Sequence, residues 1–310
     1  MISNKRIILI NSETFDKRNF YNLKSFVRNN FQLVFNKNYK KISSNYLNRF
    51  KSKNVVGIIA GLENYDKKII NLFKNLEIIS RFGIGIDNLD QKELKKRKII
   101  LKTTNNSTPY STAEYAFSLT TSLLRKIYIN HLNLKKKKWI PYRGNLLRNK
   151  TIGILGYGKV GNIVSKLFKK FNCKILVHDK KKIKNKVSIK RLFKDSDIIT
   201  VHLNLNKSTD SLIGKNLLNL MKKNSLIINT SRGEIINEVD LYYYLKKGKI
   251  SGAALDCFSK EPYYGKLTKL DNIILSPHVA SNTVECREEM ELESSKNLYT
   301  YFKKKKIIKN

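Results

Sequence analysis

Four histidines are the candidates for proton transfer in this 310-residue chain. His202 closes the apolar run "DIITVHL" and His278 follows "NIILSP", so both are expected at the carboxyl ends of β-strands, where parallel sheets bind ligands. His131 lies in a lysine-rich helix end and His178 lies within a strand, which favours a solvated and a packed ring, respectively. His202 and His278 both remain candidate proton acceptors, and His278 is preferred because it follows Pro277 in a short loop.

Two charged side chains follow neighbouring predicted strands. Arg232 comes just after "SLIINT", and Glu261 follows "SGAALD". A guanidinium can bind a carboxylate through two parallel hydrogen bonds, and a carboxylate beside a histidine orients the ring and stabilises its protonated form. Either residue alone could be an ordinary surface charge, but their joint placement predicts acid–base chemistry on a substrate that carries a carboxylate.

A glycine-rich turn predicts a dinucleotide site. Gly156, Gly158 and Gly161 form G-x-G-x-x-G between the strand "TIGIL" and a helix, and Asp179 ends the next strand. The first glycine permits a tight turn, the second lets the backbone approach a pyrophosphate, and the third lets the helix lie close to the strand. Asp179 can accept hydrogen bonds from both ribose hydroxyls, which favours NAD.

Three lysines directly after that acid raise the alternative of NADP. Lys180, Lys181 and Lys182 could offset the charge of a 2′-phosphate, but similar lysine runs occur at 135–138 and 303–306, where no phosphate is expected. Because the acid is rare in this chain and the lysines are not, NAD is predicted.

A second, smaller glycine pattern lies in "RFGIGIDNLD" at 81–90. Gly83 and Gly85 follow a strand without a third glycine, so the segment fits a loop whose backbone N–H groups face a small anion. An ordinary strand-to-helix turn remains the alternative.

The elements that position these residues form two series of β-rich runs alternating with amphipathic segments. Strands are predicted at 6–10, 31–35, 55–60, 76–80 and 98–102, and then at 151–155, 173–179, 197–203, 225–230, 251–256 and 272–276. A long helix is predicted at 111–132, capped by Ser111 or Thr112 with Glu114 in its first turn, and a last helix at about 284–302.

The predicted fold class is α/β, with two doubly wound parallel-sheet domains. The Rossmann nucleotide-binding domain, residues 105–283, is expected to be inserted within a substrate-binding domain made of 1–104 and 284–310.

Composition restricts the class of protein further. Sixty-two Lys and Arg against 24 Asp and Glu give a formal charge of +38, but lysines are spread along the whole chain with abundant Asn and Ile. This pattern indicates an AT-rich genome, and no specific nucleic-acid partner is predicted. Three distant cysteines make neither a disulfide framework nor a metal site, and no apolar run approaches a membrane span, so a cytoplasmic protein without membrane contact is expected.

Several of these segments closely resemble the D-isomer-specific 2-hydroxyacid dehydrogenases. "GILGYGKVG" with Asp179 resembles the cofactor fingerprint of that family; the segments 202–214, 228–262 and 275–283 resemble its later signatures, and "SRFGIGIDNLD" resembles its substrate loop. Two departures are Asn204, where the family usually has proline, and Ala280, where glycine is common.

The resemblance implies roles for individual residues and a homodimer formed through the nucleotide domain. Arg232, Glu261 and His278 would be catalytic, and the backbone of Ile84 and Gly85 would receive the substrate carboxylate, with Arg81 a candidate partner for a substrate phosphate. The implied cofactor-binding set is Gly156, Tyr157, Gly158, Lys159, Val160, Gly161, Asp179, His202, Thr209, Thr230, Ser231 and Asp256.

The substrate would be a small 2-hydroxy or 2-keto acid. Residues 60–70 and 281–298 look most like the short phosphoglycerate dehydrogenase branch, which acts at the first step of serine synthesis, and 310 residues leave no room for the regulatory C-terminal domain of longer relatives. The alternatives are a glyoxylate or hydroxypyruvate reductase, or another D-2-hydroxyacid dehydrogenase. A non-enzymatic, NAD-sensing module like the transcriptional corepressors that resemble this family is an alternative of a different class.

Overall fold

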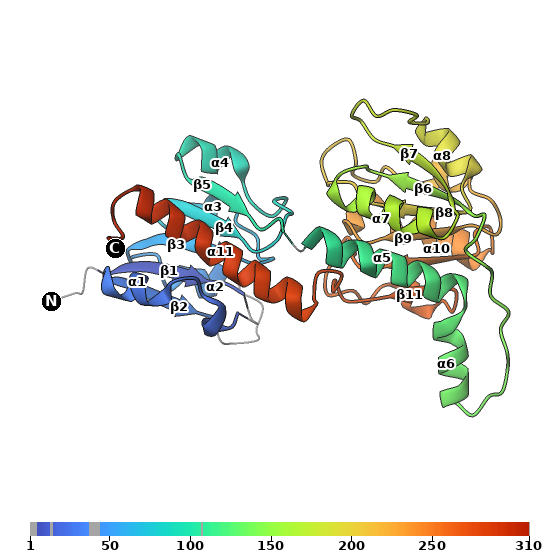
Figure 1. The fold of residues 1–310 in the computed structure, drawn as a ribbon, viewed down its shortest axis with the longest axis horizontal. Helices are drawn as coiled ribbons and strands as arrows, with labels where there is room; N and C mark the ends of the chain where they lie inside the picture. Colours follow the sequence, from blue (N-terminus) through green and yellow to red (C-terminus); the bar gives the residue numbers. More distant parts are fainter. Residues whose placement is uncertain (1–4, 13–14, 37–43, 107, 310) are drawn as a thin grey trace. The chain divides into compact units, whose positions relative to one another are not determined.

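The chain folds into two compact units, each built around one parallel β-sheet (Figure 1). A computed structural model describes residues 5–12, 15–36, 44–106 and 108–309. The smaller unit comprises Met1–Thr108 and Thr283–Asn310, and the larger unit, Pro109–Asn282, is an insertion within it. The assignment of substrate binding to the smaller unit and of cofactor binding to the larger one remains a prediction.

The smaller unit has a five-stranded sheet in the order β2-β1-β3-β4-β5. Its strands are β1 (Arg6–Ile10), β2 (Phe31–Phe35), β3 (Val55–Ala60), β4 (Ile78–Arg81) and β5 (Ile100–Thr103). Its helices are η1 (Lys17–Asn19), α1 (Leu23–Arg28), α2 (Ser44–Asn48), α3 (Lys67–Ile70), α4 (Gln91–Lys96) and α11 (Val284–Lys304).

Both faces of this sheet are covered. Ile7 and Leu9 of β1 belong to the apolar core on one face, whereas Ile8 and Ile10 belong to the core on the other, together with Phe302 of α11. Because successive side chains of a strand point to opposite faces, a strand buried on both faces requires a continuous apolar run, as in "RIILI".

The larger unit has a six-stranded parallel sheet in the order β11-β10-β9-β8-β6-β7. Its strands are β6 (Thr151–Leu155), β7 (Lys174–His178), β8 (Ile198–Val201), β9 (Leu226–Asn229), β10 (Gly252–Leu255) and β11 (Ile273–Leu275). The order reverses between β6 and β8, so the loops that follow these two strands flank the crevice in which doubly wound sheets bind ligands.

The helices of the larger unit are α5 (Thr108–Leu124), α6 (Ile127–Lys135), α7 (Lys159–Lys170), α8 (Ile189–Asp195), α9 (Lys215–Leu218) and α10 (Glu238–Lys246), with the 3₁₀ turns η2 (Gly233–Ile235) and η3 (Lys266–Lys269). Among the residues that the structure describes, no helix has both the length and the apolar character that a membrane span requires.

The helix predicted at 111–132 is wrong in two respects. Two helices occupy this segment, because Lys126 adopts a left-handed conformation with φ of 57° between α5 and α6. The first helix also begins at Thr108, so neither Ser111 nor Thr112 is its N-cap and Glu114 lies beyond its first turn. Ser111 instead donates its hydroxyl hydrogen to the carbonyl of Ala280 at 2.8 Å.

Candidate active site

His278 and Glu261 form the central contact of the candidate site. His278 lies in the short loop after β11, and its Nδ1 is 3.1 Å from each carboxylate oxygen of Glu261, in the loop after β10. Burial opposes ionisation of Glu261, but the hydrogen bond and charge of His278, the N–H of Phe258 and the charge of Arg232 outweigh it, so the pKa of Glu261 is lowered. An ionised carboxylate fixes the ring and leaves Nε2 to exchange a proton with a ligand.

Asp256 holds the loop that carries His278. This buried carboxylate follows β10, and it accepts hydrogen bonds from the hydroxyl of Ser276 at 2.6 Å and the backbone N–H groups of Val279 at 2.9 Å and Ala280 at 2.8 Å. The bonds on both sides of His278 restrain a residue whose φ of 55° lies in the left-handed region. Asp256 was predicted as a cofactor contact only, and the positioning contacts of Ser276 were not predicted.

Arg232 follows β9 and reaches the same region through a close backbone contact. A Cβ atom at the adjacent Gly233 would lie 1.9 Å from the carbonyl carbon of Phe258, so only glycine lets this turn lie against the loop that carries Glu261. Asn229, buried at the end of β9, donates to the carbonyl of Arg232 at 2.8 Å. Asn229 was not among the predicted site residues, although an asparagine at the end of an apolar strand is a sequence signal for such a positioning contact.

The other histidines have different surroundings. Burial lowers the pKa of His202 to about 3, and its Nε2 lies 2.8 Å from the hydroxyl of Thr200, so this ring is neutral at neutral pH. His178 Nδ1 lies 2.8 Å from the carbonyl of Val187. His131 is exposed on α6. Of the two candidate proton acceptors, the structure gives only His278 a carboxylate partner.

Each glycine of the predicted dinucleotide turn has the property that its role requires. Gly156 has φ of 95°, and a Cβ there would lie 2.5 Å from the carbonyl oxygen of His202. A Cβ at Gly161 would lie 2.1 Å from the carbonyl oxygen of Gly156, so α7 packs directly on the turn. A Cβ at Gly158, the N-cap of α7, would meet nothing within 4 Å, which leaves open space at a helix N-terminus.

Asp179 lies beside this turn. One carboxylate oxygen accepts from the N–H of Tyr157 at 2.6 Å and the other from the N–H of Lys181 at 2.9 Å. Partial burial raises the pKa of Asp179, but these two N–H groups and nearby positive charges outweigh it and the pKa is lowered. The carboxylate is therefore ionised next to the open space at Gly158.

The remaining residues predicted to bind cofactor all belong to the larger unit. Lys159 and Val160 form the first turn of α7, while Thr230 and Ser231 follow β9. Thr209 stands apart, because its hydroxyl donates to Asn204 within its own loop. The hydroxyl of Thr230 is buried and has no hydrogen-bond partner among the described residues. This orphaned donor, the open space at Gly158 and the acid at 179 fit a bound dinucleotide.

The predicted substrate loop belongs to the smaller unit. Gly83 has φ of 132°, and its N–H donates to the hydroxyl of Thr104 at 2.8 Å. The buried guanidinium of Arg81 donates to the carbonyls of Ala60 and Phe82 and lies against Gly83. Ile84 and Gly85 follow in this loop, partly exposed.

Comparison with known proteins identifies the class. The family model described as "D-isomer specific 2-hydroxyacid dehydrogenase, NAD binding domain" matches residues 117–280. A glyoxylate reductase of Thermococcus litoralis is 36% identical over 259 residues, which cover 78% of each chain. A D-3-phosphoglycerate dehydrogenase of Archaeoglobus fulgidus is 36% identical over 242 residues, which cover 74% of this chain and 46% of that protein. The solved structure of a glyoxylate reductase from Paecilomyes thermophila matches with a TM-score of 0.87 and 25% identity, and covers 97% of this chain and 96% of its own.

The chain therefore belongs to the D-isomer specific 2-hydroxyacid dehydrogenase family. It has the NAD-binding domain of that family, and it is an NAD(P)-dependent oxidoreductase of 2-hydroxy acids. The predicted family, fold class and enzyme class are confirmed.

Proposed function

We propose that this enzyme interconverts a small D-2-hydroxy acid and the corresponding 2-keto acid, with His278 as the general acid–base. The observation that carries the proposal is the contact of His278 Nδ1 with both oxygens of Glu261, each at 3.1 Å. Because Nδ1 is engaged, Nε2 is the atom that takes the hydroxyl proton during oxidation and returns it during reduction.

Arg232 and Glu261 would support this proton transfer. A bound nicotinamide supplies or accepts the hydride. The guanidinium of Arg232 binds the substrate carboxylate and polarises the reacting carbonyl, since its planar fork matches a carboxylate. Glu261 stabilises the imidazolium that forms when His278 takes up the proton. In the smaller unit, the proposed role of the backbone of Ile84 and Gly85 is to bind a carboxylate.

The preferred cofactor is proposed to be NAD. Asp179 is held by two backbone N–H groups beside the glycine turn, so its negative charge is fixed in place. A 2′-phosphate at that position would bring like charges together, and ribose hydroxyls would instead donate to the carboxylate.

We propose D-3-phosphoglycerate as the first substrate to test and glyoxylate as the second. The resemblance of 60–70 and 281–298 to the phosphoglycerate branch supports the first, and Arg81, the last residue of β4, is a cation beside the substrate loop and the proposed partner of the phosphate. The glyoxylate reductase that matches 78% of this chain supports the second.

A substrate panel tests both proposals. We expect NADH formation from D-3-phosphoglycerate with NAD, and we expect Arg81→Gln to lower kcat/KM for this substrate much more than for glyoxylate. Equal decreases in kcat/KM for both substrates would contradict the proposal that Arg81 binds the phosphate. Turnover of glyoxylate or hydroxypyruvate alone would replace phosphoglycerate as the substrate. Tight NADH binding without turnover of any of these acids would favour a cofactor-sensing module.

The proposed homodimer has a candidate contact surface on the larger unit. Helix α6 extends away from the sheet, and the chain returns from it through residues 136–147 (Figure 1). We name this segment, 127–147, the α6 arm. It exposes several large apolar side chains, among them Leu134 at 57%, Ile140 at 50%, Leu146 at 70% and Trp139, the single tryptophan, at 87%. A second copy of this chain would cover this surface.

A further inference from the structure

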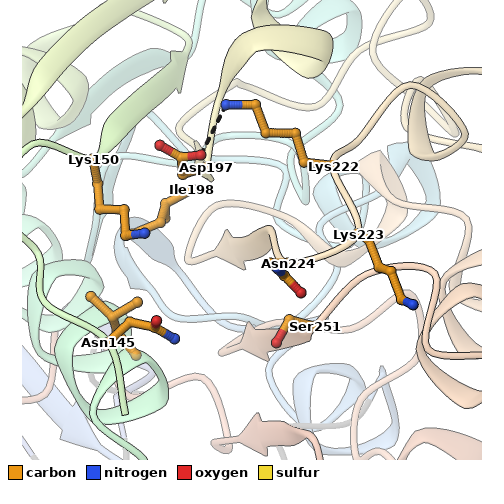
Figure 2. A pocket seen from close by; sticks show the side chains of 9 residues that line it. Asn145, Lys150, Asp197, Ile198, Lys222, Lys223, Asn224 and Ser251 are labelled. Atoms are coloured by element: carbon orange, nitrogen blue, oxygen red, sulfur yellow. Dashed lines mark hydrogen bonds and ion pairs between the residues drawn. The ribbon is translucent and has the colours of Figure 1, made fainter.

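A pocket of about 440 Å³ lies in the larger unit, and Figure 2 shows the residues that line it. It lies at the opposite edge of the sheet from the candidate active site. The active-site residues follow the carboxyl ends of strands, whereas the pocket residues precede the amino ends. Lys150 precedes β6, Asp197 precedes β8, and Ser251 precedes β10. This volume is within the range of small-molecule sites.

Positive charge exceeds negative charge in this pocket. Three lysines, Lys150, Lys222 and Lys223, line it with one carboxylate, Asp197. Asp197 accepts from the N–H of Thr151 at 2.8 Å and from the ammonium of Lys222 at 2.9 Å, the pair that Figure 2 marks. Burial opposes ionisation of Asp197, but the N–H of Thr151 and the charges of Lys222 and Lys150 prevail and its pKa is lowered.

The two other lysines are available to a ligand. Among the described residues, neither Lys150 nor Lys223 forms an ion pair with a carboxylate. Asn145, Asn224 and Ser251 add neutral polar groups, and the pocket also has an apolar part formed by Leu124 and Ile198. The lining thus offers unpaired positive charge, amide and hydroxyl hydrogen-bond donors, and an apolar surface for carbon atoms.

We propose that this pocket binds a small organic phosphate. Lysine binds phosphate as a point charge, and hydroxyl and amide groups donate to the remaining phosphate oxygens. A cation is disfavoured because the only carboxylate is already engaged by Lys222. The basic composition of the chain alone does not account for the site, because here three lysines line one pocket together with neutral hydrogen-bond donors. The site is separate from cofactor and substrate binding, and it does not rest on the proposed function.

Titration with inorganic phosphate tests the proposal. The full chain is titrated in a calorimeter at constant ionic strength, with chloride replacing phosphate, and in saturating NAD. The test variant is Lys150→Gln with Lys223→Gln, and the matched control is Lys169→Gln with Lys170→Gln. The control removes the same charge from the exposed end of α7, outside the pocket.

We expect saturable binding of one phosphate per chain and a Kd at least about tenfold higher in the pocket variant, because each lost charge-assisted hydrogen bond has an effect of that order. The control should change Kd by less than about threefold, the weaker effect of distant, screened charges. Phosphate should also raise the Tm of the wild type more than that of the pocket variant. The pocket variant, Lys150→Gln with Lys223→Gln, should turn over substrate at the wild-type rate. Loss of phosphate binding can therefore be distinguished from failure of the proposed function. Equal losses in the two variants, or no saturable binding by the wild type, would overturn the proposal.

Discussion

His202 is expected to stay uncharged in the folded enzyme at neutral pH, and the pH dependence of the free energy of unfolding tests this. Burial lowers the pKa of His202 to about 3, whereas an unfolded histidine has a pKa of about 6.5. When the pH falls below the unfolded value, the unfolded chain binds a proton that the folded chain does not. The free energy of unfolding therefore decreases as the pH falls, and this loss continues until the pH approaches the folded value.

The size of the effect follows from the difference between the two pKa values. A pH of 5 is about 1.5 units below the pKa of the unfolded histidine, and each unit corresponds to about 1.4 kcal/mol. The free energy of unfolding therefore decreases by about 2 kcal/mol between pH 7 and pH 5. The variant His202→Gln removes the titrating ring, and its amide can still bond to Thr200. Urea unfolding of the wild type and of His202→Gln at pH 7 and pH 5 gives the change in the free energy of unfolding for each protein. Subtracting the two changes cancels the contributions of the titrating groups that both proteins share.

The same variant separates the roles of two histidines. Because a ring with a pKa of about 3 is a weak base, His202→Gln should retain most of kcat and raise the KM for cofactor, as expected of a predicted cofactor contact. His278→Gln should lower kcat by about two to four powers of ten. Identical stability losses in wild type and His202→Gln, or an inactive His202→Gln beside an active His278→Gln, would refute the reasoning.

Four further predictions concern the proposed roles. Glu261→Gln should change the pH profile of kcat, because the imidazolium of His278 loses its anionic partner; an unaltered profile would contradict the proton relay. Arg232→Lys keeps the charge but loses the planar fork, so kcat/KM for the 2-keto acid should fall strongly while the Kd of NADH, measured by fluorescence, stays nearly constant. Asp179→Ala should weaken NAD binding and narrow its advantage over NADP, and a wild type with higher kcat/KM for NADP would refute this assignment. Trp139→Ser should shift the chain toward monomer in sedimentation equilibrium, and higher salt should strengthen the wild-type dimer by screening its charge of +38; a monomeric wild type at all salt concentrations would exclude the α6 arm as a dimer contact.

Strands were the most predictable part of the fold. Runs such as "RIILI" and "VVGIIA" are apolar throughout because helices cover both faces of each sheet, so these strands coincide with β1 and β3. The end of α5 was not predictable from periodicity, because its apolar pattern continues into α6. The left-handed backbone of Lys126 ends the helix, and lysine carries no sequence signal for that conformation.

The candidate site could be predicted in residue type but not in geometry. Strand ends indicated Arg232, Glu261 and His278, because parallel strands bring their carboxyl ends to one edge. The choice between His202 and His278 depends on their surroundings, since the pKa of His202 is lowered to about 3 beside Thr200 and the ring of His278 meets Glu261. The bonds of Asp256 to the loop of His278 likewise connect residues more than twenty positions apart.

The backbone at the site is more constrained than its side chains suggest. His278 has a left-handed φ of 55°, a conformation that costs a non-glycine residue on the order of 1 kcal/mol. Asp256 counters this cost with hydrogen bonds on both sides of the residue, and Gly233 lets the turn of Arg232 contact the loop of Glu261 without a Cβ clash. The carboxylate of Asp256 and the close approach at Gly233 thus hold three loops, from three strands, against one another. Proton transfer requires such fixed geometry, because a ring that turned away from Glu261 would lose both its orientation and its charge stabilisation.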